Sequence, residues 1–224
     1  MMKKQSLVAA FLAGSFALSS CGLDNAVKGA GIGAVGGAAI GAGIGRVLGN
    51  TALGTAIGGV LGGTAGTLIG RKMDKQKKEL EASVKDAKIE SVNDGQAIRV
   101  TFDSGILFAT SSASLSAASQ ATLRKFAANL AEHSDTDLLI VGHTDNTGSD
   151  RINNPLSYNR AASVRTFLLS QGVAETRMKV EGKGSTEPVA DNSTVAGRRD
   201  NRRVEVYILP SKDMVKAAEA GTLK

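Results

Sequence analysis

The spacing of hydrophobic positions changes several times along the chain, and each change predicts a different kind of segment. A short apolar stretch at residues 6–17 follows two lysines near the start of the chain. Residues 29–70 consist mainly of glycine and small apolar side chains, whereas residues 71–93 are dense in charge. Residues 94–209 have the mixed patterning of a globular domain. We therefore expect one folded domain preceded by segments of other kinds, with residues 210–224 as a short C-terminal tail.

Within residues 94–209 a period of two alternates with the longer period of helices. Strands are predicted at residues 97–102, 138–141, 178–181 and 203–208, and helices at residues 115–131 and 154–171. Asn154 and Pro155 are typical of a helix start, and Gly172 of a helix end. The uninterrupted apolar run at 138–141 suits a strand that is buried on both faces. This order indicates the α/β class, as an α+β sandwich in which helices pack on one mixed sheet.

Glycine recurs at every fourth position from Gly29 to Gly49, and again from Gly54 to Gly70. This period places the glycines near one face of a helix, where two backbones can approach closely. The stretch 47–70 carries no charge and is long enough to cross a hydrocarbon core. We favour a glycine-zipper hairpin of two helices, and a flexible linker is the alternative. The sequence does not decide whether this segment enters the membrane or self-associates beside it.

The charged residues 71–93 favour a helix, because Asp74 precedes Lys78 by four residues and Glu81 precedes Lys85 likewise. We predict a charged helical linker of about 18 residues, which would lift the following domain roughly 25–30 Å as a stalk. Its first basic residues either contact anionic headgroups or keep the segment solvated.

Residues 1–20 have the layout of a secretory signal, with a basic start and an apolar stretch too short for a membrane span. The stretch Leu18-Ser19-Ser20-Cys21 resembles a lipobox, which implies acylation of Cys21 and a lipidated N-terminal anchor at residues 21–28. The residue after the cysteine is Gly22 and not Asp. By the sorting rule of enteric bacteria, this predicts an outer-membrane lipoprotein with its domain in the periplasm. The alternative is an ordinary signal peptide with a chance cysteine. Because Cys21 is the only cysteine, no internal disulfide is expected.

The formal charge of +6 raises the question of a nucleic-acid partner. Residues 94–209 nevertheless contain 13 basic and 13 acidic side chains, so the excess lies outside the globular part. A neutral domain lacks the basic surface that a phosphate backbone requires. We therefore expect no nucleic-acid binding.

Five blocks of the globular part form a recognisable pattern. They are Val141-Gly142-His143-Thr144-Asp145-Asn146-Thr147-Gly148, Asn153-Asn154-Pro155-Leu156-Ser157-Tyr158-Asn159-Arg160-Ala161, Gly182-Lys183-Gly184, Pro188-Val189-Ala190-Asp191-Asn192, and the stretch from Gly197 through Asn201-Arg202-Arg203-Val204-Glu205. In this order they resemble the OmpA-like C-terminal domain, a peptidoglycan-associated module, over roughly residues 96–209. With the lipobox and the glycine zipper, the whole chain is similar to YiaD-type lipoproteins.

This resemblance implies a ligand, the diaminopimelate residue of peptidoglycan stem peptides, whose side chain ends in an ammonium and a carboxylate. The matching positions are Asp145 for the ammonium and Arg160 for the carboxylate, which a guanidinium can hold through two bonds. Arg202 is a second candidate for contact with the peptide or glycan. The pocket wall is expected to include Thr144, Asn146, Asn153 and Leu156. The resemblance implies no catalytic residue, cofactor or metal.

Each site residue also has a purely structural interpretation. Asp145 could form only an Asx turn, Arg160 could be a solvated helix residue, and Arg202 could cap the sheet edge. His143 is expected to be a packing residue. Two rival functions are a wall hydrolase that uses Asp145 and His143, and a pore or oligomeric scaffold formed by the glycine zipper. A transmembrane β-barrel is disfavoured because residues 22–95 lack successive alternating segments.

Overall fold

The computed structural model describes residues 61, 63–109 and 111–223. Its centre is a five-stranded sheet in the order β1-β2-β5-β3-β4. The strands are β1 (Lys88–Val92), β2 (Ala97–Asp103), β3 (Thr136–Gly142), β4 (Met178–Gly182) and β5 (Arg203–Pro210). All neighbouring pairs are antiparallel except β3 and β4, which are parallel and joined by a helical crossover. The sheet is therefore mixed, as the alternation of periods predicts.

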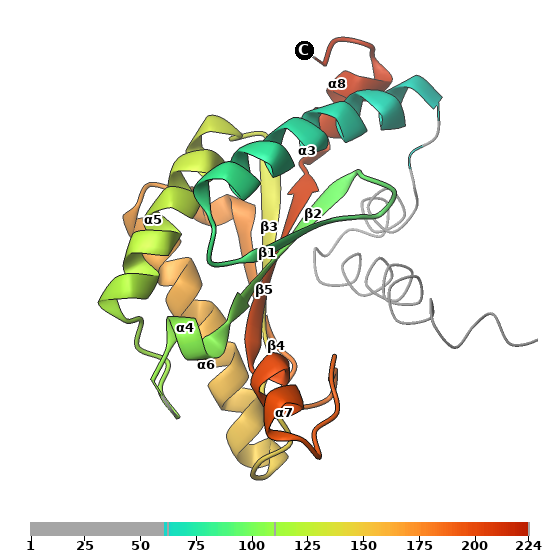
Figure 1. Cartoon of the computed structure of the whole chain (residues 1–224). Helices are drawn as coiled ribbons and strands as arrows, with labels where there is room; N and C mark the ends of the chain where they lie inside the picture. Colours follow the sequence, from blue (N-terminus) through green and yellow to red (C-terminus); the bar gives the residue numbers. More distant parts are fainter. Residues whose placement is uncertain (1–60, 62, 110, 224) are drawn as a thin grey trace, which may run out of the picture.

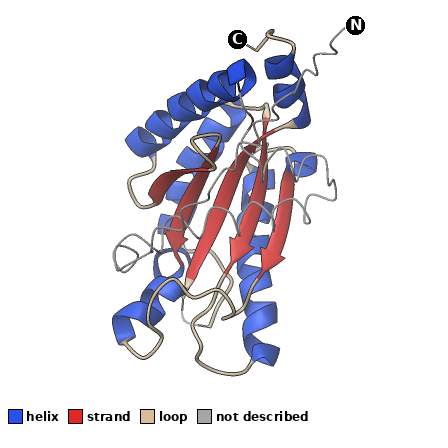
Figure 2. Ribbon diagram, turned by 90° about the vertical axis from the view of Figure 1, so that its right-hand side faces the viewer, coloured by secondary structure: helices blue, strands red, loops and turns tan. Residues whose placement is uncertain are grey.

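The larger helices pack together on one face of this sheet (Figure 2). They are α3 (Gly63–Ser83), α5 (Ala117–Glu132), α6 (Asp150–Ser170) and α8 (Lys212–Glu219). Shorter helical turns are α4 (Ser104–Leu107), η1 (Glu175–Arg177) and α7 (Val195–Asn201). The main core lies between helices and sheet, where Phe102 and Phe126 meet edge to face with ring centroids 5.6 Å apart. Such aromatic pairs stabilise a core beyond the area they bury.

The structure confirms four predicted strands and one predicted helix, and no end differs from its prediction by more than two residues. The strands are those at 97–102, 138–141, 178–181 and 203–208, and the helix is that at 115–131. The start of the second helix differs from our prediction. Helix α6 begins at Asp150 instead of Asn154, because the carbonyl oxygen of Ser149 accepts bonds from the N–H groups of Ile152 and Asn153 (2.9 Å each). Pro155 consequently lies inside the helix. The end is as predicted, since Gly172 follows the helix with φ of +90°.

The charged segment is helical but differs from the extended stalk that we predicted. Helix α3 lies across the top of the domain beside α8 and buries Ile69, Met73 and Leu80 in the main core (Figure 1). Gln76 is buried in the same stripe, where its Nε2 donates to Asn129 Oδ1 at 3.1 Å, and Lys72 pairs with Asp135 at 2.5 Å. The apolar residues form a stripe at helical spacing, which dense charge conceals in the sequence.

Two further segments also belong to the fold. Strand β1 begins at Lys88, so the sheet starts before residue 94. The tail beyond residue 210 forms α8, which packs through Met214, Val215 and Ala218. The side chain of Gln96 holds Leu61 at two points, since the Leu61 N–H donates to Gln96 Oε1 and the Leu61 carbonyl accepts from Gln96 Nε2, both at 2.9 Å. The folded unit therefore extends from residue 61 to the C-terminal helix.

The predicted signal peptide (1–20), the anchor with Cys21 (21–28) and most of the glycine zipper (29–70) lie outside the described residues. None of the helices in the described part of the chain combines the length and the apolar character that a membrane crossing needs.

Replacing Gly66 by Ala should destabilise the fold, whereas replacing Gly70 by Ala on the same helix should not. A Cβ at Gly66 would overlap the Leu61 carbonyl oxygen and lie 2.9 Å from Gln96 Nε2, while one at Gly70 meets nothing within 4 Å. Overpacking at Gly66 should lower the free energy of unfolding by about 1–3 kcal/mol. Gly70→Ala should raise it by up to about 1 kcal/mol through helix propensity. Urea unfolding of the chain in detergent, followed by circular dichroism, measures both, and equal effects would contradict the contact between Leu61 and Gln96.

Candidate functional site

Three charged side chains from different parts of the sequence gather at one end of the sheet. Asp145 lies in the loop after β3, Arg160 lies on α6, and Arg202 lies between α7 and β5. Arg202 Nη1 donates to Asp145 Oδ2 at 2.5 Å. Burial lowers the pKa of the Arg160 guanidinium, the Arg202 cation lowers it further, and the Asp145 carboxylate opposes both effects. The structure thus brings the two predicted ligand residues and the second candidate into one electrostatic neighbourhood.

The approach of α6 to the ends of β3 and β4 depends on two glycines. A Cβ at Gly142 would overlap the Ser157 carbonyl oxygen, and a Cβ at Gly182 would lie 2.6 Å from the Tyr158 backbone nitrogen. The hydroxyl of Ser157 accepts a bond from the Gly184 N–H at 2.9 Å, which ties the helix to the loop after β4. Arg160 follows Ser157 by almost one helical turn, so this close packing fixes its place in the site.

Asp145 is held by its own loop as well as by Arg202. Its Oδ1 accepts the N–H of Thr147 at 2.8 Å, which is the Asx turn considered from the sequence. Asn153 Nδ2 donates to the backbone carbonyls of Asp145 (3.3 Å) and Thr147 (3.2 Å), so α6 holds the loop. Burial alone would raise the pKa of the Asp145 carboxyl, but the bonds from Arg202 and Thr147 outweigh it and keep that pKa below its usual value. The carboxylate is therefore ionised at neutral pH.

Arg160 is buried, and its guanidinium is only partly paired. Its Nε donates to the Ser112 carbonyl oxygen at 3.0 Å, and its central carbon lies 5.4 Å from the centre of the Phe108 ring. Its Nη1 is buried and has no hydrogen-bond partner among the residues that the structure describes. Leaving a buried charged donor unpaired costs a few kcal/mol, so such an atom is rare outside a binding site. Arg160 is therefore not a solvated helix residue.

The other predicted residues contribute in different ways. Thr144 is buried, its N–H donates to the Gly184 carbonyl at 2.8 Å, and its Oγ1 has no partner within the described residues. The exposed Asn146 donates its backbone N–H to Asn192 Oδ1 at 3.3 Å. Leu156 is half-buried on α6.

Sequence reasoning missed three contributors to the site. Ser112 and Phe108 bind Arg160 from a loop with no motif of its own. Asn201 is fully buried and organises the neighbouring loop, where its Oδ1 accepts the N–H groups of Val189 and Ala190 at 2.7 and 2.9 Å. Asn201 belongs to one of the sequence blocks of the resemblance, but from that block the sequence predicts a ligand contact only for Arg202.

His143 is buried, and its ring nitrogens make no hydrogen bond to Asp145 or to any other residue that the structure describes. Burial, and secondarily Arg203, lower the pKa of His143 to about 3, against the opposing effect of Glu205. The imidazole is thus neutral, and its Nε2 lies 3.8 Å from Glu205 Oε2. Across the described ranges no three His, Cys, Asp or Glu side chains are grouped as metal ligands would be. The arrangement offers charge pairing and hydrogen bonding.

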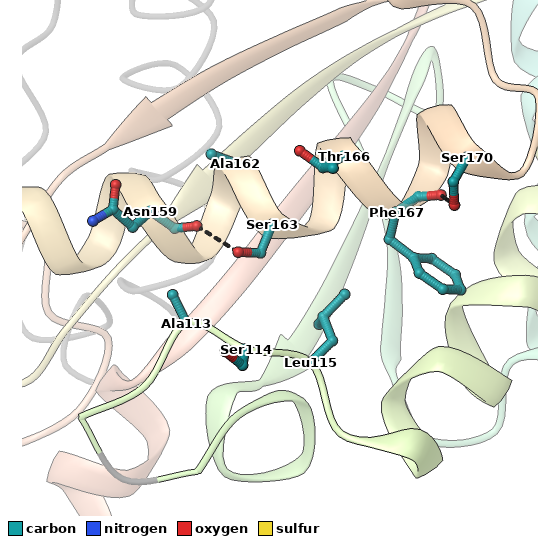
Figure 3. Close-up of a pocket in the computed structure, with 9 residues that line it drawn as sticks. All are labelled: Ala113, Ser114, Leu115, Asn159, Ala162, Ser163, Thr166, Phe167 and Ser170. Carbon is teal, nitrogen blue, oxygen red and sulfur yellow. Dashed lines mark hydrogen bonds between the residues drawn. The ribbon is translucent and has the colours of Figure 1, made fainter.

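A shallow groove of about 640 Å³ runs along α6 (Figure 3). One side is the loop at residues 113–115 and the other is the outer side of α6. Figure 3 shows the small and polar side chains that border it, namely Ala113, Ser114, Asn159, Ala162, Ser163, Thr166 and Ser170, with the apolar Leu115 and Phe167. Asp145, Arg160 and Arg202 are not among the residues that line this groove.

Comparison with known proteins places this geometry in a family. The OmpA family profile matches residues 107–202, and a glycine zipper profile matches residues 32–77. The lipoprotein YiaD of Escherichia coli is 35% identical over 142 residues, covering 63% of this chain and 65% of YiaD. The peptidoglycan-binding protein ArfA of Mycobacterium tuberculosis is 41% identical over 112 residues, covering 50% of this chain and 34% of ArfA.

The chain thus spans less than two thirds of the length of either relative. A solved structure, the cell wall anchor of the T6SS from Pseudomonas aeruginosa, superimposes with a TM-score of 0.54 at 32% identity. That comparison covers 61% of this chain and 97% of the other. The pattern of blocks around Asp145, Arg160 and Arg202 therefore has the fold that the sequence resemblance implies, and the chain carries an OmpA family domain at residues 107–202.

Proposed function

We propose that this chain is a non-catalytic lipoprotein that tethers the outer membrane to the cell wall. In this proposal the folded domain lies in the periplasm and binds the diaminopimelate residue of peptidoglycan stem peptides. Asp145 receives the ammonium of the ligand and Arg160 receives its carboxylate. The acyl chains on Cys21 hold the other end of the molecule in the membrane.

The observation that carries the proposal is the unpaired, buried Nη1 of Arg160 beside an ionised carboxylate. Asp145 and Arg160 are both buried, and they make no ion pair with each other. A zwitterionic side-chain end would supply an acceptor for the guanidinium and a donor for the carboxylate at the same time. A ligand without a carboxylate would leave the Arg160 guanidinium unsatisfied, and a ligand without an ammonium would gain no bond at Asp145, which stays paired with Arg202.

Arg202 adds a step that the sequence did not indicate. Because its Nη1 already occupies Asp145 Oδ2, an incoming ammonium competes with an internal cation for the same oxygen. The Arg202 side chain is 39% exposed, so it can turn aside at little cost or follow the ligand carboxylate. Until the ligand arrives, the pair spares Asp145 the cost of a buried, unpaired charge.

The relatives support the proposal at the level of the cell envelope. YiaD is named as a lipoprotein, ArfA as peptidoglycan-binding and the structural relative as a cell wall anchor. One domain with one pocket would bind weakly, and membrane attachment would raise its concentration near the wall. Tethering therefore needs both ends of the chain.

Asp145→Asn and Arg160→Gln should each weaken binding to purified sacculi by about 30-fold to 1,000-fold, while the domain stays folded. Each change leaves one ligand charge unmatched in a buried pocket, at a cost of roughly 2–4 kcal/mol. Co-sedimentation measures the binding and circular dichroism checks the fold. Arg165→Gln is the matched control, because Arg165 lies on the same helix but pairs with Glu175. Wild-type retention by either site variant would refute the assignment.

Competition in the same assay identifies the recognised group. A stem peptide that contains diaminopimelate should displace the wild-type chain, whereas the same peptide with lysine at that position, whose side chain lacks the second carboxylate, should not. If the lysine peptide competes equally well, Arg160 does not receive a carboxylate.

Arg202→Ala should raise the pKa of Asp145. Burial, which raises this pKa, would then be opposed only by the Thr147 bonds. Because the wild-type pKa is lowered, the carboxylate is ionised above that pKa and loses its charge as the pH falls through it. Carboxyl carbon NMR titration measures the change, and the acid limit of sacculus binding should move to higher pH with it. Arg199→Ala is the control, since Arg199 pairs with Asp103 at 2.9 Å, and an unchanged titration in Arg202→Ala would exclude the pair in solution.

A further inference from the structure

The sheet has a second face, opposite the helices, that carries its own buried apolar cluster. Its members all come from strands: Ala97, Leu139, Val141, Tyr207 and Leu209, with Val92 beside them. The strand register places Leu139 next to Tyr207, and Val141 next to Glu205. Helices α3, α5, α6 and α8 pack on the other face (Figure 2). The helices that the structure describes contribute no side chain to this cluster.

Polar groups on the same face are also withdrawn from water. Glu205 accepts from Arg203 Nε at 2.6 Å and from the Tyr207 hydroxyl at 2.5 Å. Both ring nitrogens of His143 are buried and have no hydrogen-bond partner in the described ranges. In a sheet with one face open to water, each strand alternates apolar residues that face the core with polar residues that face the solvent. In β5 every residue from Arg203 to Pro210 is buried, so this face is not of the solvated kind.

We propose that residues 29–60 of the same chain cover this second face and make the domain a three-layer structure. Because Leu61 is held by Gln96, the preceding residues are delivered to the edge of the sheet, and Gln96 directly precedes Ala97 of the cluster. Docking is then intramolecular, with a high effective concentration.

The composition of residues 29–60 suits this surface. Arg46 is the only charged residue among them, and the apolar side chains include Ile40, Ile44, Val47, Leu48 and Ile57. Glycines at every fourth position let a helix backbone approach a flat surface that carries bulky side chains such as Tyr207. The segment would bury its apolar side on the sheet instead of in lipid.

Photo-crosslinking of the full acylated chain in phospholipid vesicles tests the proposal. Benzoylphenylalanine placed at Tyr207 should form its adduct within residues 29–60 of the same molecule. Val92, half-buried on the edge strand β1, is a second position if the change at Tyr207 prevents folding. Tyr158, the other tyrosine of the chain, is 52% exposed on α6 and should give no such adduct. A mixture of isotopically light and heavy chains separates adducts within one molecule from those between two.

Adducts from Tyr207 and Val92 to a second chain or to lipid, or no adduct from either, would overturn the proposal. A deletion of residues 29–60 gives an independent measurement. It should expose the cluster and raise the fluorescence of bound anilinonaphthalene sulfonate several-fold compared with the full chain. Unchanged dye binding would contradict docking. Sacculus binding should persist in the deletion variant because Asp145 and Arg160 lie elsewhere, so failure here is distinct from failure of the proposed function.

Discussion

The site depends on the close approach of helix α6 to the ends of strands β3 and β4. Gly142 and Gly182 leave no side chain between the strands and the Ser157–Tyr158 backbone. This contact sets the height of α6, and thereby the distance between Arg160 on the helix and the loop that carries Asp145. A methyl group at either glycine would push the helix outward, and an interior packed like a crystal has no room to absorb that shift. The site therefore depends on Gly142 and Gly182 as much as on its charged side chains.

The electrostatics of the pocket are asymmetric before any ligand binds. Asp145 is satisfied by Arg202 and by its own loop, whereas Arg160 keeps one buried nitrogen unpaired. Two cations and one carboxylate gather there, so the pocket favours the arrival of a further negative group. A ligand that brings both a carboxylate and an ammonium would meet Arg160 without competition and Asp145 in exchange with Arg202. The exchange of Arg202 for the ligand ammonium at Asp145, with no matching exchange at Arg160, follows from this difference in pairing.

The region before the sheet changes how the domain can be attached to a membrane. Helix α3 is part of the core, and Leu61 is held against Gln96, so the described residues from 63 to 83 belong to the domain and do not form a separate stalk. Any reach toward the proposed membrane anchor at Cys21 must come from the residues between them. If those residues dock on the second face, the tether is shorter still. The extent of docking would then set how far the proposed wall-binding site can stand from the membrane.

The sequence by itself determined those strands and helices whose hydrophobic residues repeat with a clear local period. It predicted four of the five strands, the extent of α5, the end of α6 at Gly172, and the motif residues Asp145, Arg160 and Arg202. It did not predict that α3 joins the core, because the stripe of Ile69, Met73 and Leu80 is diluted by charges that lie on the solvent side. The pairing of Asp145 with Arg202, and the contacts of Arg160 with Ser112 and Phe108, were decided only by the tertiary structure. These partners are 48 to 57 residues apart in the chain, and only the packing of helix on sheet determines which charges become neighbours.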